Sequence, residues 1–418
     1  MAKELVLNPL KKGKAEFNLI GRAKVSDFTF KIDVESTKED SDWVYNMLNL
    51  GIDCGEHGVI YADMMGGYGT ERENVVYVHG KKKNENEKMV DDFKTKFTID
   101  WEDRFDEDNF EQIGDMCFIT VGLEKDEKDK TVYKRFLSQY DAIQYINDSL
   151  VDGVTVNVKG NLKYQIYNDA VQVKKEITSI ALSKAEEKDF KATFTQTLFL
   201  DSNSIGKPDK ETGLLNIDAY ILDFVKEYNN EKIIRMVNGK KKEGCNLPLL
   251  KPFFVKTAEN KEKLIKFLKL FKAKSKKVTQ LTVEGYFSKG DLNTVEVSEK
   301  DIPDDIKELI EEGYIDKNEI LNKIAFANGG AKKPEQMIIN KPYIKMVGSG
   351  DNKLPNMDRI ADLYTEDDIN PFLIIEQLGT IKEDEKEETN EEDDIDVDKL
   401  IEKEISEDEE NEDWLSEL

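Results

Sequence analysis

Residues 156–160 and 281–285 share the pattern apolar-x-Val-x-Gly, which places Gly160 over Gly285 at an offset of 125 residues. In both copies a predicted amphipathic helix precedes this pattern, and predicted strands precede the helix. The order of elements is three strands, a helix and two strands. The sequence therefore predicts a duplicated β-β-β-α-β-β unit, at about residues 14–184 and 190–350.

Strand signals dominate the first copy. The segments rich in β-branched or aromatic residues are 16–25, 28–34, 58–65, 75–79, 94–101, 116–123 and 155–167. One helix interrupts them between Ser138, a predicted N-cap, and Leu150. In the second copy we expect strands at 194–200, 214–224 and 232–237, and an additional helical stretch near 304–324. The chain is thus predicted to be mainly β with inserted helices.

Three strands, a helix and two further strands are the element order of the OB-fold, a small barrel that binds oligonucleotides. We therefore expect two OB-fold-like barrels in tandem. The first occupies residues 1–184 and contains insertions, and the second occupies residues 185–380 with a helical insertion near 301–325. Residues 381–418 are expected to form an acidic, largely disordered tail that binds partners.

The charge of the chain is unevenly distributed. The net charge is −26, but residues 382–418 alone contain 20 acidic residues and 4 lysines, which leaves −10 for the preceding 381 residues. Residues 232–277 contain 15 Lys and Arg against three Glu. The chain therefore contains one basic block, whose lysines and arginines can neutralise phosphates, and one separate acidic tail.

The segment from Gly153 to Gly160, which follows a predicted helix, resembles the junction between the helix and the fourth strand in bacterial and phage single-stranded DNA-binding proteins. The acidic C-terminus with an apolar end is a second shared feature. It ends in Trp414, Leu415, Ser416, Glu417 and Leu418 and so differs from the acidic-Pro-Phe tip that is usual in the bacterial proteins. The resemblance implies binding of single strands without sequence preference, and recruitment of replication partners through the tail.

Cations and aromatic rings are the side chains that bind phosphates and stack on bases. The candidate nucleic-acid-binding residues of the first copy are Arg22, Lys24, Phe30, Tyr61, Tyr68, Tyr77, Lys134, Arg135, Tyr164 and Tyr167. Those of the second copy are Arg235, Lys240, Lys241, Lys242, Phe253, Phe254 and Lys256. We expect these cations and rings to gather along one concave surface.

A structural interpretation competes with this one. Phe253 and Phe254 can belong to a core, and the lysines of residues 261–277 can form the solvated face of a helix. About half of the candidates on strands should face the interior, because alternate residues point to opposite sides. The Gly-rich stretch 66–70 can present Tyr68 from a loop or be an ordinary hairpin turn.

No catalytic or metal-binding pattern stands out. The chain has only two histidines, and Cys54, His57, His79 and Cys117 match no compact zinc pattern. We therefore expect no cofactor, no metal and no enzymatic activity. No apolar run reaches the roughly 18 residues of a membrane span. The expected location is the cytoplasm, that of the host cell if the chain is encoded by a phage.

The leading hypothesis is sequence-tolerant binding of single-stranded DNA, which would protect and present the strand during replication, recombination or repair. Trp414, Leu415 and Leu418 are the expected contacts of the tail with replication or recombination proteins, and the tail is also expected to compete with DNA. One alternative is an acidic protein-interaction or DNA-mimic module, and another is a metal-dependent nuclease. The preference for DNA over RNA and the oligomeric state stay open.

Overall fold

The structure is a computed structural model that describes residues 6–38, 40–84, 87–167, 170–210, 212–237, 240–257, 261–288, 302–311, 320, 335–348 and 352–378. The molecule is mainly β and contains a closed five-stranded barrel. The tail contacts predicted at Trp414, Leu415 and Leu418 lie outside the described residues. In the described part of the chain, no helix is both long enough and apolar enough to span a membrane.

The first half of the chain begins with strands and contains one α-helix. Its elements are β1 (Ala15–Lys24), β2 (Phe30–Glu35), β3 (Trp43–Asp53), β4 (Val59–Gly69), β5 (Val75–Lys83), β6 (Met89–Asp100), β7 (Ile119–Lys125), β8 (Thr131–Phe136), α1 (Gln139–Ser149), β9 (Thr155–Tyr167) and β10 (Ala170–Leu182). Short 3₁₀ turns lie at 55–57, 101–103, 107–111 and 115–117. The sequence predicted α1 and most of these strands, and residues 164–173, which read as a hairpin, indicate the start of β10. It missed β3 and β8.

Five strands of this half close into the barrel. Strand β1 pairs with β3, β3 with β4, β9 with β10 and β9 with β1, all antiparallel, whereas β4 and β10 pair in parallel. Helix α1 lies between β4 and β9 in the chain, and Ala142, Ile143 and Ile146 bury its apolar face. The Ser138 side chain accepts a hydrogen bond from the Tyr140 N–H, which confirms the predicted N-cap.

The β5–β6 hairpin and the 3₁₀ turns of residues 107–117 are insertions into this barrel. Val78, Ile99, Phe110, Ile113, Phe118 and Leu137 form a small core of their own beneath them. The stretch 66–70 was considered as a loop or hairpin turn, but residues 66–69 are the end of β4 and pair with β3. Tyr68 is therefore fixed in the sheet.

The second half has more short strands. Its elements are β11 (Lys191–Leu200), β12 (Ile205–Pro208), β13 (Leu214–Val225), β14 (Glu227–Tyr228), β15 (Glu231–Lys232), β16 (Ile234–Val237), β17 (Lys240–Glu243), β18 (Cys245–Lys256), α2 (Lys261–Leu268), β19 (Lys277–Ser288), α3 (Asp304–Glu311), β20 (Gln336–Pro342), β21 (Ile344–Val347), β22 (Leu354–Met357), β23 (Arg359–Thr365) and α5 (Pro371–Gln377).

The strand pairings of the first half recur here in the same order. Strand β11 pairs with β13, β13 with β18, β19 with β20 and β19 with β11, all antiparallel, whereas β18 and β20 pair in parallel. The third strand was predicted at residues 232–237. That prediction was wrong, because β16 pairs with β17 in a separate hairpin and β18 takes the central place. Pro248 and Pro252 weaken the strand signal of β18 in the sequence.

The two halves share one continuous sheet. Strands β1 and β11 pair antiparallel, with Phe17 opposite Phe194. Gly160 lies opposite Phe17 on the other side of β1, and Gly285 lies opposite Phe194 on the other side of β11. The glycines that align in the sequence therefore occupy corresponding positions on either side of an approximate local two-fold axis.

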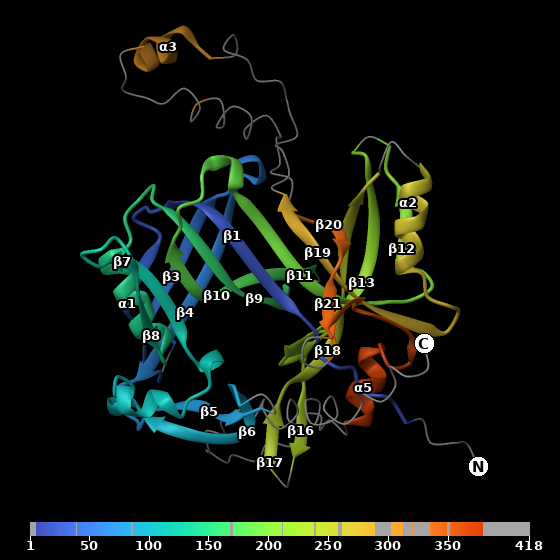
Figure 1. Ribbon diagram of the computed structural model, residues 1–418, viewed down its shortest axis with the longest axis horizontal. Helices are drawn as coiled ribbons and strands as arrows, with labels where there is room; N and C mark the ends of the chain where they lie inside the picture. Colours follow the sequence, from blue (N-terminus) through green and yellow to red (C-terminus); the bar gives the residue numbers. More distant parts are fainter. Residues whose placement is uncertain are drawn as a thin grey trace.

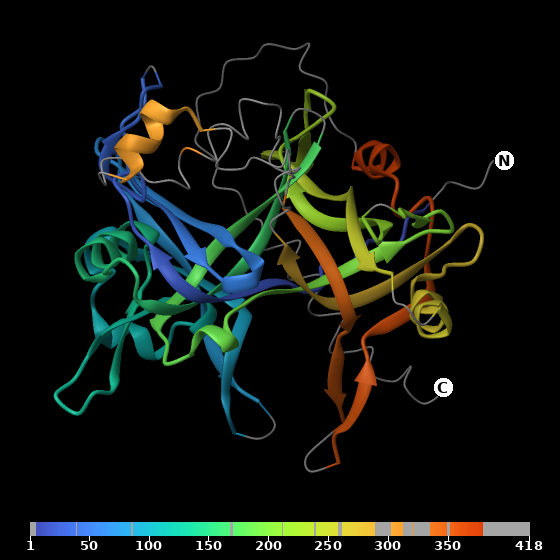
Figure 2. The same ribbon diagram turned by 90° about the horizontal axis from the view of Figure 1, so that it is seen from above.

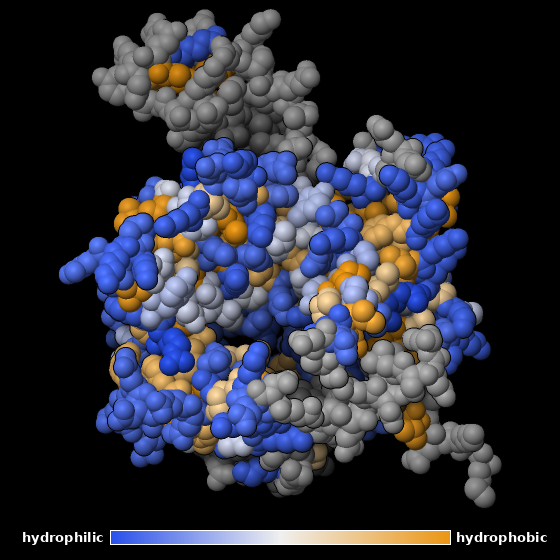
Figure 3. All heavy atoms as spheres, viewed as in Figure 1, coloured by the Kyte–Doolittle hydropathy of each residue, from blue (hydrophilic) through white to orange (hydrophobic). Residues whose placement is uncertain are grey.

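Figure 2 shows the two strand-rich halves side by side, with β1 and β11 crossing between them. In Figure 1, α1 covers the outer side of the first half and α2 lies at the far side of the second. The surface in Figure 3 is hollowed near its centre, between the two halves. A candidate binding site therefore lies in the region where the two halves join.

Candidate nucleic-acid interface

A groove of about 1020 Å³ lies over the strands that join the two halves. Its lining comes from both sides of the Phe17–Phe194 pair, on β1 and β9 from the first half and on β11 and β19 from the second. These strands are hydrogen-bonded neighbours in one sheet, so the base of the groove is a continuous β-sheet surface. The groove is open to solvent along part of its surface.

Four lysines line this groove, and three glutamates lie among them. The lysines are Lys159, Lys191, Lys256 and Lys341, and the glutamates are Glu16, Glu56 and Glu284. Two of the glutamates are engaged by cations, since Lys341 Nζ lies 2.6 Å from a Glu284 oxygen and Lys14 Nζ lies 2.9 Å from a Glu16 oxygen. Four lysines against three glutamates make the lining only weakly cationic, and Lys341 would have to exchange Glu284 for a phosphate.

Three side chains form a compact group at one end of the groove. The Lys256 ammonium lies 5.4 Å from the centroid of the Tyr286 ring, and the His57 and Tyr286 ring centroids are 5.2 Å apart. Hydrogen bonding to Tyr286 raises the pKa of Lys256, so the ammonium stays charged. Burial lowers the pKa of His57, so its ring is neutral at pH 7. The Lys256 cation, the Tyr286 ring and the neutral His57 ring thus lie together.

Of the predicted binding residues, Lys256 is the one that lines the groove. Arg22, Lys24 and Tyr61 lie on the outside of the first barrel, where Arg22 pairs with Glu187 at 3.2 Å and Lys24 with Asp53 at 3.6 Å. These exposed pairs leave the cations able to exchange partners.

Three predicted residues are buried, and their assignment to the strand-binding surface is corrected. Tyr164 is 4% exposed and its hydroxyl donates to Gln196 Oε1 at 2.9 Å. Arg235 is 4% exposed and its Nε donates to the Gly244 carbonyl at 2.7 Å. Phe253 is 0% exposed and packs in the main core. Each lies on the inward side of its strand, as alternation requires for about half of the candidates.

The remaining candidates fall in different places. Phe30 and Phe254 are half-buried, and Tyr68 packs against Trp101 and Tyr140. Lys134 lies 4.1 Å from the Tyr145 ring centroid, and Arg135 lies 4.5 Å from that of Phe118. The exposed or partly exposed candidates are Tyr77, Tyr167, Lys240, Lys241 and Lys242.

The basic block of residues 232–277 is not gathered on one surface. Its lysines at 240–242 belong to the β16–β17 hairpin, those of α2 lie at the opposite end of the second half, and Lys256 alone of the block lines the groove (Figure 1). The expected single basic channel is therefore wrong for most of the block. The basic residues are contiguous in the sequence, but β18 runs between the β16–β17 hairpin and α2. It therefore separates the lysines of the hairpin from those of the helix in space.

Sequence reasoning missed most of the lining of the groove. Lys159, Lys191, His57, Tyr286 and Lys341 were not among the candidates, although all five line it. The repeat contained a usable signal, since Lys159 precedes Gly160 and Tyr286 follows Gly285. The neighbours of the two repeated glycines therefore lie in the groove at the junction of the two halves.

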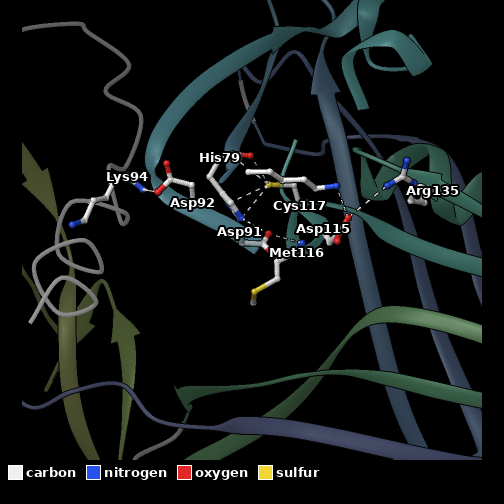
Figure 4. Close-up of polar contacts among 9 residues, drawn as sticks. His79, Asp91, Asp92, Lys94, Asp115, Met116, Cys117 and Arg135 are labelled. Carbon is white, nitrogen blue, oxygen red and sulfur yellow. Dashed lines mark hydrogen bonds and ion pairs between the residues drawn. The ribbon is translucent and has the colours of Figure 1, made fainter. Parts of the chain in front are cut away.

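Cys54, His57, His79 and Cys117, which match no compact zinc pattern in the sequence, are not gathered into one cluster. Figure 4 shows His79 and Cys117 together, with Cys117 Sγ 3.2 Å from His79 Nδ1 and His79 Nε2 2.7 Å from Asp91 Oδ1. Asp91 also accepts a hydrogen bond from the Met116 N–H at 3.0 Å. Cys54 is buried in the main core instead. In the described residues, no group of three or more metal-ligating side chains is placed to hold a metal.

A family model and a solved structure show what the chain is similar to. A family model described as YorF matches residues 81–275, which is less than half of the chain. The crystal structure of a deletion mutant of the single-stranded DNA-binding protein from Thermus aquaticus is similar at 10% sequence identity and a TM-score of 0.26, covering 66% of this chain and 88% of that chain. A TM-score this low does not establish a common fold. No curated protein matches the chain.

Proposed function

We propose that the chain binds single-stranded DNA in the groove between its two halves, without sequence preference and without catalysis. The observation that carries this proposal is the groove itself, which combines four lysines with the His57–Tyr286 ring pair. Lysines that neutralise phosphates supply affinity for any sequence. Rings that stack on bases add affinity for unpaired strands, whose base faces are accessible.

The strand pairings support the further proposal that both halves are OB-type barrels. If only the strands at the barrel positions are counted, β1, β3 and β4 precede α1, β9 and β10, whereas β11, β13 and β18 precede α2, β19 and β20. In each half the third of these strands pairs in parallel with the fifth. The boundary proposed between residues 184 and 185 then falls just before β11, which starts the second unit at Lys191.

The acidic tail is proposed to recruit replication or recombination proteins and to compete with DNA.

A salt titration of binding tests this function. Fluorescence anisotropy of labelled oligo-dT, matched duplex DNA and matched RNA should give tightest binding to a single strand, weakening with salt by a slope of about −0.7 per phosphate contact. The variant Lys256→Glu should weaken binding and reduce the slope. Lys353→Glu, an exposed lysine outside the groove, is the matched control and should change neither.

The same measurement separates the alternatives. Failure to bind any single strand at low salt refutes the proposal. Capture of a DNA-binding protein by the body of the chain, without strand binding, is the result expected of a DNA mimic. Cleavage of the labelled strand after addition of magnesium or manganese would contradict the absence of catalysis.

A further inference from the structure

A second hollow, of about 470 Å³, lies between the first barrel and the inserted β5–β6 hairpin. It shares Asn161 and Thr178 with the groove, so the two spaces adjoin. A strand lying in the groove would therefore pass the mouth of this hollow. We call it the aromatic pocket.

Aromatic and thioether side chains form its walls. The rings are those of Trp43, Tyr77, Trp101 and the buried Phe118, and the thioethers are those of Met65 and Met116. Tyr77 is 53% exposed, Met65 48% and Met116 72%, so large apolar groups face solvent at the rim. Exposed apolar groups that border a hollow are characteristic of a binding site rather than of ordinary surface.

The tryptophan rings are held in position by neighbouring cations. The Arg104 guanidinium lies 4.1 Å from the Trp101 ring centroid, and its Nε donates to Asp141 at 2.7 Å. The Arg72 guanidinium lies 5.9 Å from the Trp43 ring centroid. Rings fixed in this way lose little conformational entropy when a ligand stacks on them.

Polar groups also line the pocket. Ser138, Gln139, Asn161 and Glu176 contribute hydroxyl, amide and carboxylate groups, and Gln139 Nε2 donates to Glu176 Oε1 at 3.1 Å. Among the lining residues in the described part of the chain, Glu176 is the charged group, and none is Lys or Arg. A carboxylate repels phosphate but can accept hydrogen bonds from a base. The lining thus suits a flat, uncharged ligand with polar edges.

We propose that the aromatic pocket takes one unpaired nucleobase of a strand whose backbone lies in the groove. This inference rests on the proposed function and adds a distinct base site to it. The β5–β6 insertion, which lies outside the five-stranded barrel, supplies part of the wall of the pocket. The five barrel strands alone would therefore not form this pocket.

Intrinsic fluorescence provides a direct test, because the chain has three tryptophans, Trp43, Trp101 and Trp414. In the full-length Trp414→Phe variant, only the two pocket tryptophans report. Oligo-dT should quench this fluorescence by stacking. An oligonucleotide of the same length with abasic sites throughout should bind more weakly and leave the fluorescence of the bound protein unquenched.

Variants of Tyr77 provide the second test. Tyr77→Ala removes a wall of the pocket at an exposed position and should weaken oligo-dT binding about tenfold, a typical effect of losing one base stack. Tyr77→Phe keeps the ring and should bind normally. Tyr133→Ala, at an exposed tyrosine away from both hollows, is the matched control.

The two proposals fail in different ways. If anisotropy detects oligo-dT binding but the pocket tryptophans are not quenched and Tyr77→Ala binds normally, the base site is refuted and the groove stands. Quenching without any effect of Tyr77→Ala on affinity also refutes the pocket, because the base would then stack on a tryptophan without entering the space that Tyr77 borders. If anisotropy detects no binding to any single strand, both proposals are refuted.

Discussion

Burial decides which aromatic and basic residues of this chain can bind a ligand. Tyr164 and Tyr167 are three residues apart on β9, yet the first is buried against Gln196 and the second is exposed. Lys251 and Lys256 on β18 differ in the same way, since Lys251 donates to the Val171 carbonyl at 3.3 Å and Lys256 lines the groove. Residue type alone does not separate these roles.

Tyr164→Phe tests the assignment of this residue to the core. The substitution removes the hydroxyl that donates to Gln196 Oε1 and leaves that buried acceptor without this donor. Urea denaturation should give a free energy of unfolding lower by about 1–2 kcal/mol. The affinity for oligo-dT should be unchanged in the folded variant. A large loss of affinity for oligo-dT with an unchanged free energy of unfolding would show instead that Tyr164 contacts DNA.

Lys251 gives the stability of the fold a dependence on pH. Burial, opposed by Glu335 and reinforced by Lys175, lowers the pKa of Lys251 to about 8. The unfolded chain, with an ordinary lysine pKa, then holds more protons above pH 8, so the contribution of this group to the free energy of unfolding rises with pH until both states are neutral.

Lys251→Met should therefore stabilise the protein at pH 7. The penalty that it removes is at most about 3 kcal/mol, from the difference between the two pKa values. Thermal denaturation of both proteins from pH 7 to pH 10.5 should give a difference that shrinks as pH rises. A difference that is constant over this range would show that packing, not the charge of Lys251, determines the effect.

The strand is the unit in which the repeat has structural meaning. In β9 and β19 the repeated glycines allow close approach of the adjoining strand: a Cβ at Gly160 would overlap the Glu176 carbonyl oxygen, and one at Gly285 would overlap the Ile338 carbonyl oxygen. Each would also press on the phenylalanine opposite, Phe17 or Phe194. The glycine of the pattern apolar-x-Val-x-Gly is thus explained by sterics, because the fourth strand has no room for a Cβ at this position.

Gly160→Ala and Gly285→Ala should each destabilise the fold by about 1–3 kcal/mol, because the backbone of the neighbouring strand must move. Urea denaturation measures the loss. Lys163→Ala, an exposed substitution on the same strand as Gly160, should change the free energy of unfolding by less than about 0.5 kcal/mol. Equal effects at Gly160 and Lys163 would contradict the steric explanation.

At the scale of the whole molecule, the β1–β11 pairing creates the groove. It joins strands that are far apart in the chain and brings Lys159, Lys191, Lys256 and Lys341 around one floor, although only Lys256 belongs to the basic block. The net charge outside the tail is negative. Binding of a polyanion must therefore depend on local placement of charge rather than on the average.

Removal of the acidic tail tests its competition with DNA. Truncation before Lys382 removes a net charge of −16 that is tethered to the body. Oligo-dT binding should tighten by about threefold or more at low salt and by less at high salt, because the tail acts at a high local concentration and its attraction is screened. Equal affinities for the full-length and truncated chains at low salt would refute the competition and leave the groove unaffected.

The sequence by itself determined the mainly β character, helix α1 with its Ser138 cap, and the paired glycines of the repeat, because alternation, capping and steric limits act among residues near one another in the chain. Only the tertiary structure decided that β18 replaces residues 232–237 as a central strand, that Tyr164, Arg235 and Phe253 face inward, and that the groove forms along β1 and β11. Those outcomes depend on which distant strands pair, and pairing is set by the sum of contacts across the whole sheet rather than by any local pattern.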